Sequence, residues 1–435
     1  MEKRDFTKAL EQAKAWDAQD PLREYSSHFI RPETPYYLEA NGLGMMCREA
    51  RASLERVTEE WERYGVGGWM QGEVPWFFYP ERLAGAQAPL VGAQPEELVL
   101  AGTTTTNIHS VIATFYTPTE TRWKILIDEL NFPSDRYAVE SQIAQKGRRS
   151  EEALAVVKSR DGWILSEEDI IQAMTPEVQV AFFPSVLHQS GQLLDIEKIG
   201  RAAHERGILV GFDLSHSAGV VPHDLEAAQA DFAVWCNYKY LNGGPGCPAT
   251  LYINRRHFGR TPALAGWHGY QKGRQFSMLP YFEAAGTAGG WQHGSPHILN
   301  MAPLEGAQSL VLKAGIHAIR KKSLSLTDWF IQLTKEWLEP LGAVIATPVE
   351  AERRGGQVTL VHPAGGAINE AIEKGFVHVE EQKAAYREQN IPRGDLSHYQ
   401  RSDMIRASFS PLYNSYEDVC RLADAIRCFM EEAEA

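Results

Sequence analysis

The sequence predicts an α/β protein with a large domain built on a mainly parallel β-sheet and a smaller α+β domain after it. Between about residues 95 and 260, short runs of apolar residues alternate with stretches of helical pattern. Continuous apolar strands separated by helices are typical of a parallel sheet that is covered on both faces. After about residue 300, a long helical pattern is followed by a mixed segment, which indicates a second domain packed on the first.

The elements are expected in the following order. Residues 1 to about 70 are mostly helical in pattern, with a break at RPETP, residues 31–35. Strand-like runs then occur at 124–130 (KILIDEL), 178–184 (VQVAFFP), 208–214 (ILVGFDL), 231–235 (DFAVW) and 249–255 (ATLYINR). Residues 301–338 are predicted to form one long helix, and GGQVTLVHP and IRASFS mark the smaller α+β segment.

Composition and charge exclude several classes of protein. The 435 residues are 44% hydrophobic, which is enough to bury a sizeable core. The formal charge of −13 opposes nucleic acid as a natural partner, because binding phosphates requires a basic face. No apolar stretch is long enough to span a bilayer and the charged N-terminal segment does not resemble a signal peptide, so a cytoplasmic protein is expected. The five cysteines lack a CxxC pair and predict neither a disulfide framework nor a zinc site.

Polar residues follow two of the predicted strands, at the edge where open α/β sheets bind their ligands. Asp213 ends one apolar run and His216 comes three residues later, although the aspartate alone could equally be a helix N-cap. Tyr238 and Lys239 follow the next run, directly before the glycine-rich turn NGGPG, which lets backbone approach a ligand closely. A lysine at a strand end is usually solvated, but a poorly hydrated one is an amine nucleophile suited to Schiff-base chemistry. A lysine and a carboxylate at two such strand ends are what pyridoxal phosphate requires, as an anchor for its aldehyde and a partner for its pyridinium nitrogen.

Two further segments fit the same cofactor. AGTTTTNIH, residues 101–109, places four threonines before an apolar helical pattern, so hydroxyl and backbone N–H groups gather at the start of a predicted helix. Such a start is an anion site, although the threonines could also be an ordinary helix cap. NFPSDRYAVESQ, residues 131–142, offers Phe132 as a ring to stack on a flat cofactor and Asp135 as a second carboxylate. An aromatic residue at a strand end can equally belong to the core.

Four motifs give the sequence a resemblance to a known family. FPSDRYAVESQ, FDLSHSAG, WCNYKYLNGGPG and GWHGY occur in an order and at separations that closely resemble those of kynureninases, fold-type I pyridoxal phosphate enzymes of the class V aminotransferase-like superfamily. The resemblance runs from NGLG at residues 41–44 to IRASFSPLYNSYEDV at 405–419. It implies a large cofactor-binding domain with a seven-stranded, mainly parallel sheet at 71–310 and a small α+β domain at 311–435. The helical segment 1–70 is then expected to belong to the small domain and the dimer contact.

The resemblance also implies a role for each matching residue. Lys239 matches the lysine that binds pyridoxal phosphate covalently, and Tyr238 matches a tyrosine that contacts the phosphate and is implicated in proton transfer. Arg406 matches the arginine that holds the substrate α-carboxylate, a task suited to the guanidinium fork. The implied cofactor contacts are Thr104 and Thr105 at the phosphate, Phe132 on the pyridine, Asp213 at its nitrogen, Asp135 and His216 beside it, and Trp267 and Ser295 from the neighbouring subunit. A homodimer with shared active sites and no metal is therefore expected.

The implied reaction is hydrolysis of the bond between the β and γ carbons of kynurenine or 3-hydroxykynurenine, which yields alanine and anthranilate or its hydroxylated form. Several positions on the substrate side depart from the usual pattern of the family: Gly42 in place of a serine, Trp69 near the residue that senses the substrate ring, His188 and Gln189 in place of an aromatic residue, and Tyr270 where histidine is frequent. These changes leave open another 2-amino-4-oxo acid as the substrate.

Two other classes of function remain as alternatives. A class V aminotransferase or lyase would share the lysine and the aspartate, but a cysteine desulfurase would also need a mobile nucleophilic cysteine, and none lies in an obvious exposed loop. A non-enzymatic scaffold would have no need of a nucleophilic amine.

Overall fold

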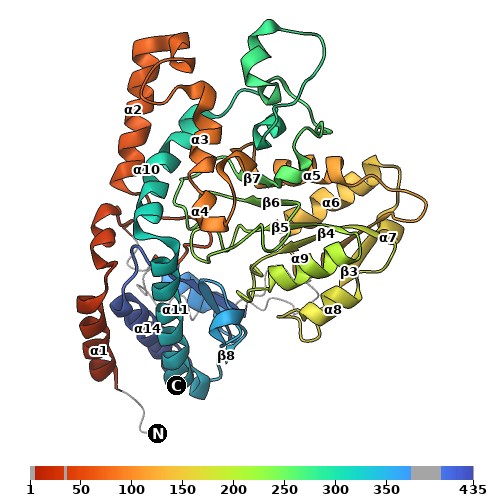
Figure 1. The fold of residues 1–435 in the computed structure, drawn as a ribbon. Helices are drawn as coiled ribbons and strands as arrows, with labels where there is room; N and C mark the ends of the chain where they lie inside the picture. The colour runs from red at the N-terminus through yellow and green to blue at the C-terminus, as the bar shows by residue number, and fades with distance from the viewer. Residues whose placement is uncertain (1–4, 34–36, 374–402, 435) are drawn as a thin grey trace.

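The computed structural model describes residues 5–33, 37–373 and 403–434. The described chain contains one seven-stranded and one three-stranded β-sheet. Long helices run along one side of the molecule and connect the region of the large sheet with that of the small sheet (Figure 1). The N-terminal and C-terminal helices lie beside each other at the small-sheet end.

The large sheet has the strand order β1-β7-β6-β5-β4-β2-β3. Neighbouring strands from β6 to β3 are parallel, whereas β7 runs antiparallel to both β1 and β6. The strands are β1 (Leu98–Leu100), β2 (Lys124–Asp128), β3 (Leu154–Val157), β4 (Val178–Pro184), β5 (Leu209–Asp213), β6 (Phe232–Trp235) and β7 (Thr250–Ile253). The predicted mainly parallel sheet is confirmed. The two strands that the sequence pattern did not predict, β1 and β3, are short strands at the two edges.

The helices occupy most of the remaining chain. They are α1 (Phe6–Gln19), α2 (Arg48–Tyr64), α3 (Tyr79–Gly85), α4 (Ala88–Val91), α5 (Thr104–Phe115), α6 (Pro133–Gln145), α7 (Ser150–Ala153), α8 (Glu167–Gln172), α9 (Ile196–Glu205), α10 (Ile298–Ala314), α11 (Ile316–Leu333), α12 (Gly365–Glu373) and α14 (Tyr416–Glu434). The short 3₁₀ helices used below are η2 (Gly65–Trp69), η6 (Trp267–Gly269) and η7 (Lys272–Ser277). The expected helical character of the first 70 residues is confirmed for α1 and α2.

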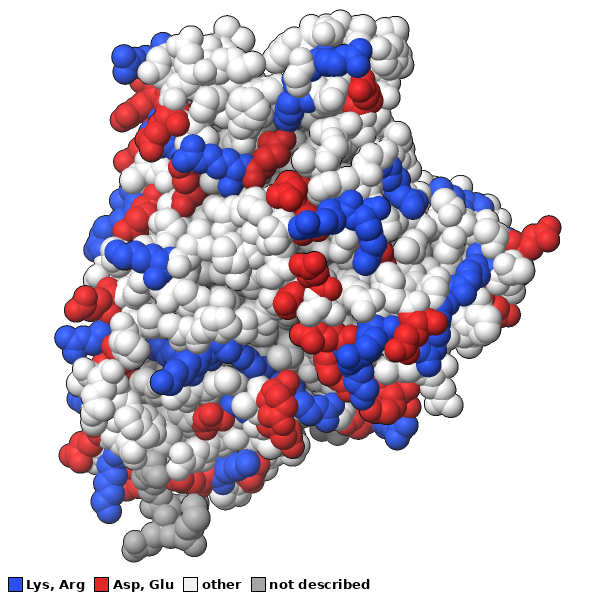
Figure 2. All heavy atoms as spheres, in the orientation of Figure 1, with Lys and Arg blue, Asp and Glu red and all other residues white. Residues whose placement is uncertain are grey.

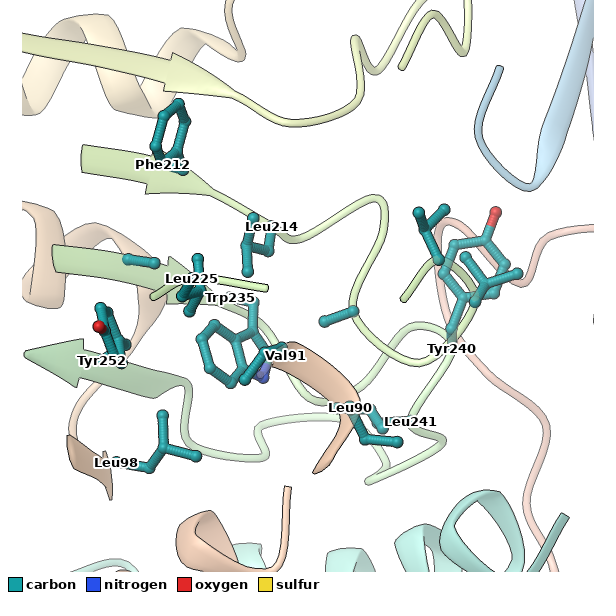
Figure 3. Packing of buried hydrophobic residues seen from close by; sticks show 14 of the residues in the cluster. Leu90, Val91, Leu98, Phe212, Leu214, Leu225, Trp235, Tyr240, Leu241 and Tyr252 are labelled. Atoms are coloured by element: carbon teal, nitrogen blue, oxygen red, sulfur yellow. The ribbon is translucent and has the colours of Figure 1, made fainter. Parts of the chain in front are cut away.

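The alternation of side chains along the strands builds a separate core on each face of the large sheet. On β6, Phe232 and Val234 pack with α5 and α6, whereas Ala233 and Trp235 pack with α9 and α10 on the other face. Figure 3 shows the second of these cores, in which Trp235 lies near Leu214 and Val91. Because both faces are covered, the strands are apolar throughout, which is why they were recognisable in the sequence.

The small sheet is antiparallel and consists of β8 (Val344–Ile345), β9 (Gln357–Val361) and β10 (Met404–Ser408) in the order β10-β9-β8. Its core includes side chains of α11, α14 and also α1, so the first helix packs with the last part of the chain. The expectation of one helix over 301–338 is wrong. Gly315 has φ +80°, which a right-handed helix cannot include, and it separates α10 from α11.

The surface carries both signs of charge. On the face drawn in Figure 2, basic side chains lie singly or in short runs among acidic ones. No helix among the described residues is long and apolar enough to cross a membrane.

Candidate active site

The carboxyl ends of the parallel strands bring most of the predicted site residues to one edge of the large sheet. The loop after β2 leads to Phe132, β5 ends at Asp213, and Lys239 follows β6. Asp213 is in register with Pro184 at the end of β4 and with Val234 near the end of β6. These strands therefore end at the same level of the sheet, and the loops that follow them lie at the same edge.

The loop that carries Lys239 is fixed at both ends. Before it, the indole N–H of Trp235 donates to Gln87 Oε1 at 2.9 Å in the core. The Asn237 side chain donates to the carbonyl of Pro248 at 2.6 Å, across the glycine-rich turn. Asn242, at φ 56°, closes the turn by donating its N–H to the Lys239 carbonyl at 2.9 Å. The apolar run before the lysine thus anchors the loop, and Lys239 itself is half-buried.

The Lys239 amine lies between an imidazole and an aromatic ring. Its Nζ is 2.8 Å from His216 Nε2 and 5.9 Å from the centre of the Phe132 ring. Burial, followed by the charges of Lys239 and His188, holds the pKa of His216 well below its usual value. His216 is therefore neutral and accepts the hydrogen bond. The Phe132 ring is 45% exposed, which leaves it open to a flat ligand.

A pair of carboxyl groups lies beside the amine. Asp135, in the first turn of α6, is 1% exposed and lies close to the carboxyl group of Asp213, which is 7% exposed. Burial and the Asp213 charge raise the pKa of Asp135 well above its usual value. Asp135 therefore carries the proton of the pair. Asp213 also accepts from the Ser215 N–H at 2.7 Å.

Asp128 is a third carboxyl group behind this pair, and the sequence analysis did not identify it. It ends β2, is 1% exposed, and neither of its oxygens has a hydrogen-bond partner of normal geometry among the described residues. Burial raises its pKa to about 7, and its charge in turn contributes to the raised pKa of Asp135. The available signal was that Asp128 ends the run KILID in the same way that Asp213 ends LVGFD.

Arg406 reaches the site from the small sheet. It lies on β10 opposite Thr359 of β9, and its guanidinium donates to the carbonyl of His188 at 3.0 Å. The Gln357 side chain donates to the same carbonyl at 3.0 Å. His188, Phe132, Asp213 and His216 line a small cleft. The small sheet therefore holds one wall of the cleft that contains the lysine's neighbours.

A short N-terminal segment, residues 37–44, connects the lysine loop to the arginine strand. Gly44 donates its N–H to the Tyr238 carbonyl at 2.7 Å, and a Cβ at Gly44 would stand 2.3 Å from the Lys239 carbonyl. At the other end of the segment, Ser408 of β10 donates its N–H to the Leu38 carbonyl at 2.9 Å. Only glycine fits at residue 44, so this contact depends on NGLG.

The start of α5 has the groups that a phosphate needs. Thr103 caps the helix through its contacts with Thr106, which leaves the side chains of Thr104 and Thr105 uncommitted to the cap. Thr104 Oγ1 is buried without a hydrogen-bond partner among the described residues. An orphaned buried hydroxyl at a helix N-terminus fits an anionic group.

Tyr238 is placed beside the lysine but faces a cysteine. The neighbouring Cys236, followed by burial, raises the pKa of the Tyr238 phenol, and the Asp213 charge acts in the same direction. The hydroxyl therefore stays protonated and can act as a donor.

Four predicted residues lie outside this group of contacts. Trp267 is 42% exposed and its indole N–H donates to the Gln275 carbonyl at 3.3 Å, while Ser295 is exposed on a loop. Trp69 packs against Trp76 and His268, at ring distances of 5.9 and 6.1 Å. Gly42 is exposed, and a Cβ there would stand 3.2 Å from Glu39 Oε2. The roles of these four residues remain predictions.

Comparison with known proteins decides the family. The model of the class-V aminotransferase family matches residues 86–422. A kynureninase of Bacillus thuringiensis subsp. konkukian is 43% identical over 434 residues, which cover 100% of this chain and 97% of the relative. The chain belongs to the kynureninases of the class-V aminotransferase family. A second kynureninase, from Geobacillus thermodenitrificans, is 42% identical over 98% of this chain and 95% of its own length. Kynureninases depend on pyridoxal phosphate, and Asp213 and the open Phe132 ring line the cleft beside which Lys239 lies, as this cofactor needs.

Solved structures with a similar fold include cysteine desulfurases. The apo cysteine desulfurase of Thermococcus onnurineus NA1 has a TM-score of 0.68 at 16% identity, covering 91% of this chain and 95% of its own. A C-DES mutant with glycine covalently linked to its PLP cofactor has a TM-score of 0.70 at 16% identity, with coverages of 90% and 97%. These similarities concern the fold. In this kynureninase, four of the five cysteines are buried, and burial raises the pKa of Cys47 to about 11, so the thiols lack the environment of an exposed nucleophile.

Proposed function

We propose that this protein hydrolyses the bond between the β and γ carbons of L-kynurenine or 3-hydroxykynurenine, releasing L-alanine and anthranilate or its hydroxylated form. The observation that carries the proposal is the grouping of Lys239, the Asp135–Asp213 pair and Arg406 around His216 and His188, from four different elements. The 43% identity to kynureninases over the whole chain supports the same reaction.

The described residues suit pyridoxal phosphate at each end of its ring. Phe132 offers an open face for stacking, and Asp213 offers an anionic partner for the pyridinium nitrogen. Thr104 and Thr105, at the start of α5, offer hydroxyl and N–H donors to the phosphate. When bound, the cofactor supplies an electron sink for the bonding electrons of the substrate.

The remaining steps belong to the chain's own side chains. Arg406 holds the α-carboxylate of the substrate and fixes its orientation in the cleft. The Lys239 amine removes the proton from Cα, and His216, neutral at 2.8 Å, orients the amine by accepting a hydrogen bond from it. Asp135 keeps its proton beside Asp213, which leaves a single negative charge at the ring nitrogen. Tyr238, whose phenol stays protonated, donates a proton to the departing fragment.

A homodimer with shared active sites completes the proposal. Trp267 and Ser295 are exposed on one chain and would reach the phosphate of the neighbouring subunit. Around Trp267, the chain exposes large apolar side chains in η2, in η7 and directly after η7, among them Val66 at 85%, Phe276 at 54% and Met278 at 66%. Exposing such an apolar surface to water is unfavourable, and the surface fits an interface between two copies of this chain. Cytoplasmic location and the division into residues 1–70, 71–310 and 311–435 belong to the same proposal, the latter supported by the two separate sheets.

The proposal is tested by incubating purified protein and pyridoxal phosphate with kynurenine or 3-hydroxykynurenine and measuring alanine. We expect equal amounts of alanine and of the aromatic acid. Release of alanine from a different 2-amino-4-oxo acid alone would reassign the substrate. Accumulation of a keto acid and pyridoxamine phosphate would instead indicate a transaminase.

A further inference from the structure

Gln357, at the start of β9, joins the small sheet to the loop that follows β4. The residue is 1% exposed, and its Nε2 donates to the carbonyl of His188 at 3.0 Å and to that of Gln189 at 3.3 Å. Its Oε1 accepts from the Asn41 Nδ2 at 2.7 Å. Because a backbone carbonyl can only accept, these partners allow a single orientation of the Gln357 amide. Three hydrogen bonds therefore fix this side chain.

The His188 carbonyl is shared between Gln357 and Arg406. The Arg406 guanidinium donates to the same oxygen, also at 3.0 Å. A carbonyl oxygen has two lone pairs, so the two donors use its full capacity. The residue opposite Arg406 in the small sheet is Thr359, two positions after Gln357. Paired residues share a face of a sheet, as do residues two positions apart, so Gln357 and Arg406 reach the carbonyl from the same face.

This carbonyl is the fixed group that Arg406 contacts. Among the described residues, no carboxylate forms an ion pair with Arg406. The bond to the carbonyl uses one of the five N–H donors of the guanidinium, and the others can bind a carboxylate in the paired geometry typical of arginine. An arginine side chain has many rotamers, so the direction of its guanidinium depends on what holds it. A displaced His188 carbonyl would therefore turn the guanidinium.

We propose that Gln357 is a positioning residue: by holding the His188 carbonyl, it sets the direction in which Arg406 presents its remaining N–H groups to the α-carboxylate of the substrate. The inference rests on the proposed function, in which Arg406 binds that carboxylate. It adds that a buried residue, acting through a backbone oxygen, determines how tightly the carboxylate is bound. Asn41 contributes one step further away, because it orients the Gln357 amide.

The test compares L-alanine with ethylamine as ligands of the holoenzyme, since these two amines differ only in the α-carboxylate. The ratio of their dissociation constants, measured by calorimetry, cancels changes that affect both ligands alike. We expect the wild type to bind L-alanine at least about 100-fold more tightly, and Arg406→Leu to remove most of this preference. Gln357→Met, which keeps the length of the side chain and removes its donors, should lower the preference by about 5- to 20-fold.

Thr347→Val is the matched control. Thr347 is 3% exposed and donates to the carbonyl of Ser190 at 2.5 Å, so the variant loses a buried hydrogen bond to the same loop and leaves the donors to His188 in place. It should be less stable to urea and keep the wild-type preference for L-alanine. Asn41→Ala should lower the preference by less than Gln357→Met does, because both donors of the Gln357 amide remain.

The outcomes separate this inference from the function on which it rests. If the wild type binds L-alanine no better than ethylamine, the proposed role of Arg406 fails. If the wild type has the preference and Gln357→Met keeps it while losing stability, Gln357 only contributes to packing and the inference is refuted. An equal loss of preference in Thr347→Val would also overturn it, because any weakening of the loop would then suffice. Should Gln357→Met not fold, an unchanged preference in Asn41→Ala would decide against the inference.

Discussion

The two ends of the candidate site differ in how many of their polar groups already have partners within a single chain. At the pyridine end, Asp135, Asp213 and His216 are at most 8% exposed, and each has a contact with another member of the site. At the phosphate end, Thr104 has a buried hydroxyl with no partner among the described residues, while Trp267 is 42% exposed and donates its indole N–H to the Gln275 carbonyl. The first end is complete within the chain, and the second has unused donors and exposed apolar rings.

The difference follows from where each end lies in the fold. The residues of the pyridine end follow strands whose register fixes them within one sheet. Trp267 belongs to η6, in an extension whose exposed side chains face away from the core. The comparison teaches that sheet register can assemble the chemistry of the ring, whereas the phosphate end keeps unused donors that the proposed homodimer would complete.

Lys239→Ala should have the largest effect, because it removes the central group of the complete end. We expect alanine release to fall at least about 1,000-fold, since one residue supplies both the amine nucleophile and the proton transfer. The visible absorption of the bound cofactor should be lost as well. Lys158→Ala, an exposed lysine paired with Glu129 at 2.9 Å, is the control and should keep both. An unchanged absorption band in the Lys239 variant would falsify the assignment of this lysine.

Asp128→Asn tests how much stability the protein loses by burying an ionisable carboxyl group behind the pyridine end. The pKa of Asp128 is about 7 in the folded protein against 3.8 for an ordinary aspartate. The preference of Asp128 for its protonated form in the folded state therefore contributes fully to the free energy of unfolding below pH 3.8. This contribution is lost as the pH rises through 7. Asparagine does not ionise, so at pH 8 the variant of the apoprotein should exceed the wild type in unfolding free energy by on the order of 4 kcal/mol.

Urea unfolding at pH 4.5 and pH 8 measures this effect, and the two proteins should differ much less at the lower pH. Glu205→Gln, on the surface, should show no such pH dependence. Equal stability of Asp128→Asn and the wild type at pH 8 would mean that Asp128 ionises without cost where it stands.

Trp267→Ala would remove the indole that we expect at the phosphate end. We expect activity to fall about 10- to 100-fold if the indole N–H binds the phosphate, because a hydrogen bond to a charged group is lost. Mixing this variant with Lys239→Ala under conditions of subunit exchange should restore activity. One site of each hybrid dimer would then combine an intact Lys239 with an intact Trp267. Absence of any recovery, with exchange verified by mass, would place both residues in the same subunit's site.

Asp135→Asn should have the smallest effect on activity, about 3- to 10-fold, because a carboxyl group that keeps its proton resembles an amide donor. The amide N–H can still bond to Asp213. Asp213→Asn is the informative counterpart, since it removes the negative charge itself and should cost far more. Equal losses in the two variants would show that both carboxyl groups are ionised.

The pyridine end was predictable from the sequence because each of its residues follows an apolar run. Asp213 and Lys239 were recognised in this way, although Asp128, which ends β2, was not. The break between α10 and α11 was missed because a single glycine within a helical pattern is often tolerated, and only its φ of +80° reveals the turn. The role of His188 as a wall of the cleft depends on contacts with Arg406, which is far away in the sequence. Spacing along a chain cannot show such a contact.

The segment formed by residues 37–44 has a consequence for how the protein is made. It emerges from the ribosome well before its partner Ser408, which lies about 370 residues further along the chain. Loop-closure entropy makes a pairing of such sequence separation slow, and here it must wait until β10 has been synthesised. The cleft is therefore assembled after the large sheet can already have formed. A nascent chain can bury its main core well before it can bind an amino acid.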